Sequence, residues 1–207
     1  MPSKIILTRD TIRQICRSYK NGQSAQNIAT ANNLTLKVVY STLKREGIER
    51  RKPVVYNRQR FDQTPKSYYI KEKFSPQEKE LFIAGLMLYY GEGAKTGNTI
   101  DFANSDPKLL KAFLSFLRVI CTIDESKLRF YLYCFSDQDA SQLISFWGKY
   151  LCVSKTQFTK PYVRPAIRSG KRKMVYGLLH IRYSDKRLLQ EVLKKGENLL
   201  YSLYNLK

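Results

Sequence analysis

Residues 8–47 carry apolar side chains at helical spacing in three short runs. In the first run, Ile12, Ile15, Cys16 and Tyr19 recur at intervals of three and four, which places them on one face of a helix. The later runs repeat this pattern with Ala25, Ile28, Ala29, Val39 and Leu43. A residue suited to capping precedes each run, namely Thr8, Ser24 and Thr35, and turn residues follow each run. We therefore predict three short helices in residues 1–48.

The second and third predicted helices are joined by a tight turn at Asn32 and Asn33, which is the arrangement of a helix-turn-helix. Residues 18–48, SYKNGQSAQNIATANNLTLKVVYSTLKREGI, resemble the helix-turn-helix of resolvases and related transposases in spacing, caps and core positions. The resemblance implies that the third helix enters the major groove of duplex DNA. A helical bundle that docks onto another protein is the alternative.

The exposed side of the third helix then supplies the DNA contacts. We expect Lys37, Tyr40 and Ser41 to read base edges, with Thr35 at the amino end of the helix. Basic residues farther along are expected to meet phosphate, which positions the protein without specifying sequence; they are Lys44, Arg45, Arg50 and Arg51.

Residues 49–74 show no sustained period and carry two prolines and many charges, so we interpret them as a basic linker. Aromatic residues interleave its cations, and we expect them to pack onto a neighbouring domain rather than to stack on bases; they are Tyr56, Phe61, Tyr68 and Tyr69. The remaining residues, 75–207, form a second domain.

This second domain begins with a capping box, because Ser75 and Glu78 can bond each other's backbone amides and Pro76 occupies the first helical position. The helix that follows is apolar around most of its circumference at residues 81–90, so it is buried on more than one side. It ends in Gly91, Glu92 and Gly93. Farther on, TIDFANSDPKLL and LLHIRYSDKRLL both combine a strand, a Ser-Asp cap and paired leucines.

We also expect a strand at residues 127–135, a helix at residues 137–150 and a hairpin whose arms are residues 155–163 and 172–183. Basic residues gather on this hairpin and next to it, and we predict that they clamp the DNA backbone; they are Lys155, Lys160, Arg164, Arg168, Lys171, Arg172, Lys173 and Arg182. The fold class is therefore α+β, with a sheet covered by helices on one face.

Residues 85–93, GLMLYYGEG, resemble the motif of LAGLIDADG homing endonucleases, and the resemblance extends over residues 75–200. In that family two such helices pack together, and their terminal acids hold divalent metal ions beside the scissile phosphates. The resemblance implies that Glu92 is catalytic and binds Mg²⁺, that Asp101 is a further ligand, and that a homodimer brings two Glu92 side chains together. Lys95 is the nearest lysine in sequence, and no second motif of this kind is present.

The charge points to the same class of partner. The chain has 37 Lys and Arg against 17 Asp and Glu, a formal net charge of +20. An excess of this size favours a polyanion, here double-stranded DNA. The four cysteines form no CxxC pair and there is one histidine, which disfavours a zinc site. We see no signal sequence and no apolar run long enough for a bilayer, so we expect a cytoplasmic protein, nucleoid-associated when bound, without a membrane partner.

Three functions remain open at this point. In the first, the protein binds DNA, uses the LAGLIDADG-like sheet to read sequence and needs no cofactor. Alternatively, it is a magnesium-dependent homing endonuclease, or it binds RNA and assists splicing. The helix-turn-helix argues against the RNA function, and the sequence does not decide between the first two.

Overall fold

A computed structural model describes residues 7–52, 58, 61–166 and 174–205. The chain divides into two compact units, Met1–Pro65 and Lys66–Lys207. The predicted linker is therefore shared between them. Its last part belongs to the second unit, where Tyr68 is 8% exposed and the Tyr69 amide donates to the Cys121 carbonyl. Phe61, in the first unit, and Tyr69 are both exposed.

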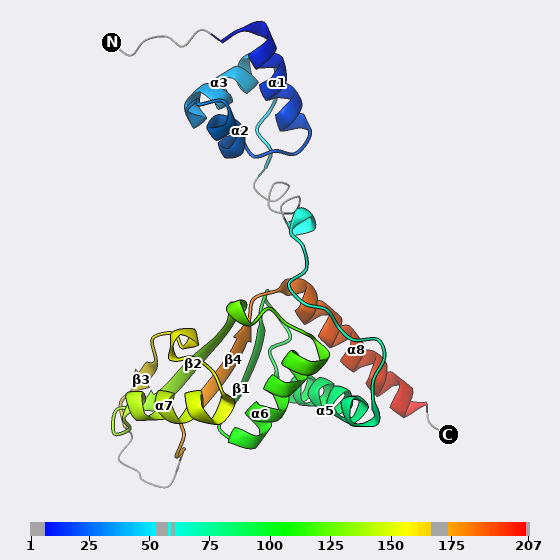
Figure 1. Ribbon diagram of the computed structural model, residues 1–207, viewed down its shortest axis with the longest axis vertical. Coiled ribbons are helices and arrows are strands. Elements are labelled where there is room, and N and C mark those ends of the chain that lie inside the picture. The colour runs from blue at the N-terminus through cyan, green and yellow to red at the C-terminus, as the bar shows by residue number, and fades with distance from the viewer. Residues whose placement is uncertain (1–6, 53–57, 59–60, 167–173, 206–207) are drawn as a thin grey trace. The chain divides into compact units, whose positions relative to one another are not determined.

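The first unit contains α1 (Arg9–Lys20), α2 (Ala25–Ala31) and α3 (Leu36–Arg45) (Figure 1). Each helix begins where its cap was predicted, because the side chains of Thr8, Ser24 and Thr35 accept backbone N–H groups of their own first turns. The apolar faces meet in a core built around Ile15, Ile28, Ala29, Val39 and Leu43. This confirms the three-helix arrangement.

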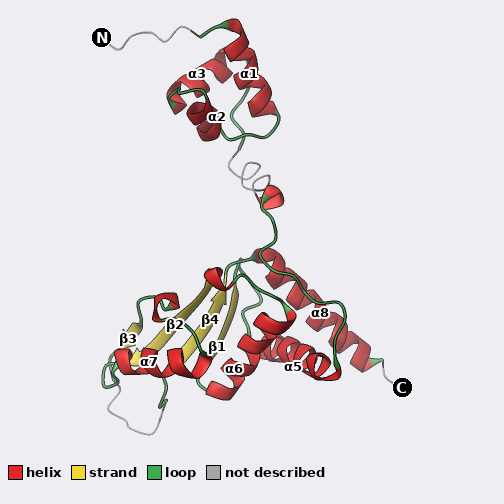
Figure 2. Ribbon diagram, viewed as in Figure 1, coloured by secondary structure: helices red, strands yellow, loops and turns green. Residues whose placement is uncertain are grey.

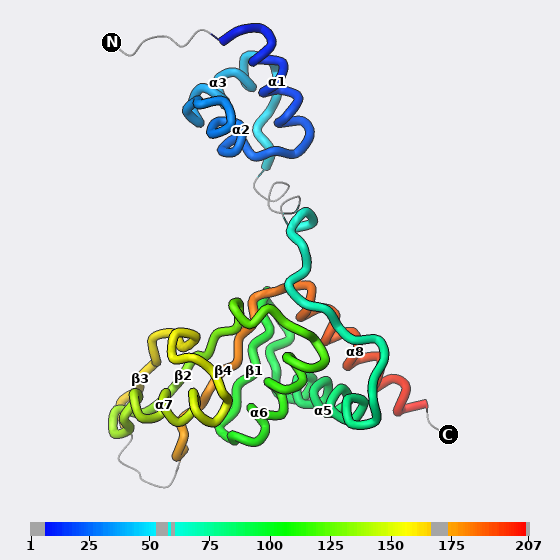
Figure 3. Tube along the Cα trace, viewed as in Figure 1, coloured from blue at the N-terminus to red at the C-terminus, as the bar shows by residue number. Residues whose placement is uncertain are grey.

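The second unit is an α+β fold whose described residues form a four-stranded mixed sheet in the order β1-β4-β2-β3 (Figures 2 and 3). The strands are β1 (Ile100–Asn104), β2 (Leu128–Phe135), β3 (Tyr162–Arg164) and β4 (Leu178–Tyr183). β4 pairs antiparallel with both β1 and β2, and β3 pairs parallel with β2.

The predicted hairpin is wrong, because β2 lies between its two arms. The burial of the strands gives the physical reason. β3 is exposed at all three positions and forms an edge, whereas β4 buries Leu179, Ile181 and Tyr183 and takes a central place in the sheet. Adjacency in sequence therefore did not become adjacency in the sheet.

Helices of the second unit lie on one side of the sheet: α5 (Pro76–Glu92), α6 (Pro107–Ser115), which continues into the π-helical turn η1 (Phe116–Ile120), and α7 (Ala140–Leu151). α8 (Lys186–Tyr204) packs mainly against α5. The short 3₁₀ turns η2 (Glu125–Lys127) and η3 (Lys155–Gln157) flank the sheet. α5 begins with the predicted capping box, and the two Ser-Asp segments cap α6 through Asp106 and α8 through Asp185.

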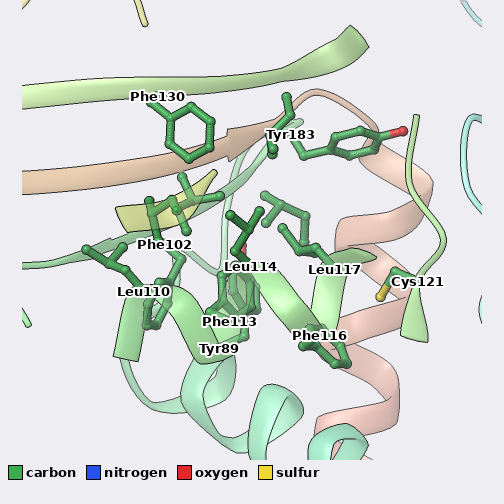
Figure 4. Close-up of a cluster of buried hydrophobic side chains, with 14 of the residues drawn as sticks. Tyr89, Phe102, Leu110, Phe113, Leu114, Phe116, Leu117, Cys121, Phe130 and Tyr183 are labelled. Carbon is green, nitrogen blue, oxygen red and sulfur yellow. The ribbon is translucent and has the colours of Figure 1, made fainter. Parts of the chain in front are cut away.

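The core fills the space between the sheet and these helices (Figure 4). Phe113 of α6 is its centre: its ring lies 4.4 Å from that of Phe102, 5.5 Å from that of Tyr89 and 5.8 Å from that of Phe116. Alternate residues of β1, β2 and β4 point into this core, so the intervening residues lie on the opposite face.

Candidate nucleic-acid interface

The exposed side of α3 carries the residues predicted to contact DNA. Lys37, Ser41 and Lys44 are exposed, and Tyr40 is half-buried between them and the core. With Ile48, Glu49 and Arg50 they line an open cavity of about 630 Å³ beside the helix. The surface is therefore concave and mostly basic, with long flexible side chains at its rim.

Arg50 joins this surface through an aromatic contact. Its guanidinium carbon lies 3.8 Å from the centre of the Tyr40 ring, within the range of a cation–π interaction. The contact orders two side chains that were predicted separately, one as a base reader and the other as a phosphate contact. Thr35 and Arg45 are also exposed, but the hydroxyl of Thr35 accepts the Val38 amide and so serves the helix first.

Arg51 was predicted to meet phosphate, and in the structure its guanidinium has partners within the first unit. Its guanidinium donates to the carbonyls of Gly22, at 3.0 Å, and Gln23, and it stacks on the Tyr19 ring at 4.1 Å. Its backbone amide bonds the Tyr19 hydroxyl. The turn after α1 presents carbonyls with no helical partner, and Arg51 satisfies them, so this cation holds the first unit together.

The face of the sheet that the core leaves uncovered forms a second surface. Register places its residues in rows across the strands: Asp101–Arg182–Arg129, then Ala103–His180–Tyr131, then Leu178–Tyr133–Tyr162, with Phe135 beside Arg164 at the edge. These residues are exposed or half-buried. The face therefore combines arginines with a run of aromatic rings.

The predicted basic clamp is divided by this topology. Arg182 lies on the central strand β4, Arg164 lies on the edge strand β3, and Lys155 and Lys160 are exposed in the segment that leads to β3. Arg168, Lys171, Arg172 and Lys173 lie outside the described residues. Arg164 and Arg182 thus share the open face, although not as arms of one hairpin.

Asp101 lies on the open face of β1 with both carboxylate oxygens engaged. Oδ1 is 2.7 Å from His180 Nδ1, and Oδ2 accepts from Arg182 Nε at 2.8 Å. Burial raises the pKa of Asp101, but the hydrogen bond from His180 and the cationic partners outweigh it and hold that pKa below its usual value. The carboxylate therefore organises two basic side chains.

Glu92 occupies the last position of α5, where a carboxylate is disfavoured by the helix dipole. Its side chain is exposed and accepts a hydrogen bond from Asn104 Nδ2, at the end of β1. Lys95 donates to the Gly91 carbonyl at 3.2 Å, so it caps a backbone carbonyl at the end of the helix. An amide is thus the partner that the structure gives to this acid.

These residues do not fit a magnesium site as they are placed. Asp101 is held by a histidine and an arginine, and a cation would have to displace them. Among the residues that the structure describes, no group of three or more His, Cys, Asp and Glu is arranged to hold a metal. Hard cations require several oxygen ligands, and Glu92 contributes one carboxylate.

Gly85 of α5 makes a close packing contact within the second unit. A Cβ added to Gly85 would lie 2.1 Å from Phe116 Cγ, so the absent side chain lets α5 approach η1 closely. The surface of α5 at Gly85 is therefore covered by Phe116, and it does not offer a small-residue contact for the same helix of a second copy. Ile83, which is 39% exposed, lies on the side of α5 that faces away from this contact.

Several residues of the open face were not predicted as site residues: Arg129, Tyr131, Tyr133, Tyr162 and His180. A signal was present in the sequence of β2, where polar and aromatic residues alternate with apolar ones in LRFYLYCF. That alternation separates two faces of a strand but does not tell which face the helices cover.

Among the described residues, no helix is long and apolar enough to cross a membrane. Comparisons of the chain with protein-family models, with curated proteins and with solved structures found no match.

Proposed function

We propose that this protein binds double-stranded DNA in a sequence-specific manner, through α3 of the first unit and the basic face of the sheet in the second. The observation that carries the proposal is the exposed side of the capped helix α3, where Lys37 and Ser41 are exposed and Tyr40 lies half-buried beside them. The fit of such a helix to the major groove supports it.

The order of roles along α3 follows from its geometry. Lys37 and Ser41 are one turn apart on the exposed side and near the amino end, the part of a recognition helix that reaches base edges. Lys44 and Arg45 follow in the last turn, where cations also complement the helix dipole. They and Arg50 are assigned to phosphates.

The net charge of +20 supports a polyanionic partner, and it supplies most of the affinity in such complexes. On the second unit, Arg129, Arg164 and Arg182 give the open sheet face a positive character. A protein that meets DNA at two surfaces gains affinity beyond either contact alone, provided that both can engage together.

The proposal is limited to binding. Glu92 bonds an amide and Asp101 is neutralised by its neighbours, so the described residues assign no group to the hydrolysis of a phosphodiester. The LAGLIDADG resemblance therefore contributes the expectation of a DNA-facing sheet, and the endonuclease remains an alternative for experiment.

Affinity measurements on single-residue variants test the proposal. On a selected duplex, Lys37→Ala should lower the preference over unrelated duplex by about 1–3 kcal/mol, because a base contact is lost. Arg50→Ala should weaken both complexes equally and reduce the log–log salt slope by about one.

Lys194→Ala removes the same charge from an exposed position on α8 and is the control. If Lys37→Ala and Lys194→Ala bind alike, and both bind selected and unrelated duplex as the wild type does, α3 does not read DNA.

A further inference from the structure

The open face of the sheet carries more aromatic surface than contact with DNA phosphates requires. Tyr133 is at its centre, with ring centroids of Tyr131 and His180 both 4.9 Å away and that of Tyr162 5.2 Å away. The rings come from β2, β3 and β4 and so span most of the width of the sheet. Tyr162 is 45% exposed.

These rings are not needed for the hydrophobic core. The core lies on the other face, where alternate residues such as Phe130 and Leu132 of β2 are fully buried. No other helix or strand of the described residues is placed over the tyrosines, which remain half-buried or exposed. An aromatic cluster in water on a sheet indicates a ligand with flat apolar surfaces.

Cations surround the rings and define the charge of that ligand. The Arg182 guanidinium lies 5.0 Å from the Tyr131 ring centre, and that of Arg164 lies 5.7 Å from the Tyr162 ring centre. Asp101 is the acid that the described strands place on this face, and it is already paired. The ligand is thus expected to be both anionic and aromatic.

We propose that the open face binds single-stranded DNA, with unpaired bases stacking on Tyr131, Tyr133 and Tyr162 and with Arg164 and Arg182 meeting the phosphates. Base–aromatic stacking on a basic groove is how proteins hold single strands without reading sequence. In a duplex the base faces are stacked on one another, so tyrosine rings on a sheet cannot reach them.

This proposal rests on the proposed function but changes the partner of the sheet face from paired to unpaired DNA, and it concerns residues other than those of α3. The protein would then recognise a duplex joined to an unpaired stretch, with α3 on the paired part. Deoxyribose is favoured over ribose as the sugar because α3 of the same chain is proposed to bind duplex DNA. RNA is therefore the alternative that the test must exclude.

The test measures anisotropy of labelled oligomers with the full chain: a deoxythymidine 15-mer, a uridine 15-mer and a blunt duplex. We expect Tyr133→Ala and Tyr162→Ala each to weaken deoxythymidine binding about tenfold and to leave duplex binding nearly unchanged. Tyr133→Phe should retain wild-type affinity, because the ring and not its hydroxyl carries the stacking.

Tyr201→Ala is the matched control, since Tyr201 is 71% exposed on α8 and off the sheet. The fluorescence of the buried Trp147 reports whether each variant is folded. Tyr162 lies at the exposed edge, so Tyr162→Ala tests stacking without altering the centre of the aromatic cluster. The loss should persist at high salt, where phosphate contacts weaken and stacking remains.

Deoxythymidine affinity that is unchanged in both tyrosine variants, or lowered equally by Tyr201→Ala, would overturn the proposal. Uridine binding more than tenfold tighter than deoxythymidine binding would overturn the assignment to DNA. Failure of the α3 assignment would appear separately, as duplex binding that Lys37→Ala does not alter.

Discussion

Two glycines of the same helix provide a test of how the second unit is packed. A Cβ at Gly85 would lie 2.1 Å from Cγ and 2.5 Å from Cβ of Phe116, whereas a Cβ at Gly91 would meet nothing within 4 Å. Rotation of the Phe116 side chain cannot relieve this overlap, because its Cβ does not move when the ring turns. Gly85→Ala therefore requires α5 and η1 to separate.

The two substitutions should change stability in opposite directions. Alanine in place of a helical glycine gains up to about 1 kcal/mol from backbone entropy. At Gly85, overpacking costs about 1–3 kcal/mol, and the rigid neighbour favours the upper end, which leaves a net loss of about 2 kcal/mol. For a unit of this size that is a fall in Tm of about 4–8 °C, against a small rise for Gly91→Ala.

Trp147 makes the assay specific to the second unit, because it is the only tryptophan and is fully buried there. Thermal unfolding followed by its fluorescence should therefore separate the two variants. A Phe116→Ala background removes the contacts with Cγ and the ring but keeps the 2.5 Å contact with Cβ, so the cost of Gly85→Ala should fall there without vanishing. Equal effects of the two alanines, or strict additivity with Phe116→Ala, would refute this packing.

Three further substitutions test particular contacts. Arg51→Ala should speed hydrogen exchange of amides in α1–α3, since two carbonyls lose their donor, whereas Arg50→Ala should leave exchange unchanged. Asp101→Asn should lower stability at pH 7, and the difference in stability from the wild type should shrink below about pH 4. A carboxylate with a lowered pKa stabilises the fold above its unfolded pKa of about 3.9 and loses that contribution as it is protonated. Urea unfolding of both proteins at the two pH values measures this difference. Glu92→Gln should leave duplex affinity within about twofold, and gel assays with magnesium should show no cutting by the wild type; cutting that Glu92→Gln abolishes would establish the endonuclease instead.

Much of the first unit and the start of the second could be predicted because the signals are local. Thr8, Ser24, Thr35 and Ser75 each bond amides within their own first turn, so the residue type and its place before an apolar run suffice. The strand and helix of each Ser-Asp segment follow from equally local chemistry.

The sheet order and the open face could not be predicted in this way. Strand pairing joins residues far apart in sequence, such as Asp101 and Arg182, and a hairpin between neighbouring segments was the simplest expectation. The role of Arg51 likewise depends on carbonyls about thirty residues earlier in the chain. The rings of Tyr131 and Tyr133 were visible as an alternation, but only the placement of the helices shows which face stays open.

Selection of bound duplexes from random DNA by the full chain tests the central claim most directly. Sequence-specific binding through α3 predicts that successive rounds enrich one motif, and that Lys37→Ala relaxes it while Lys194→Ala preserves it. Retention of all sequences alike, with an affinity set by salt alone, would contradict that claim.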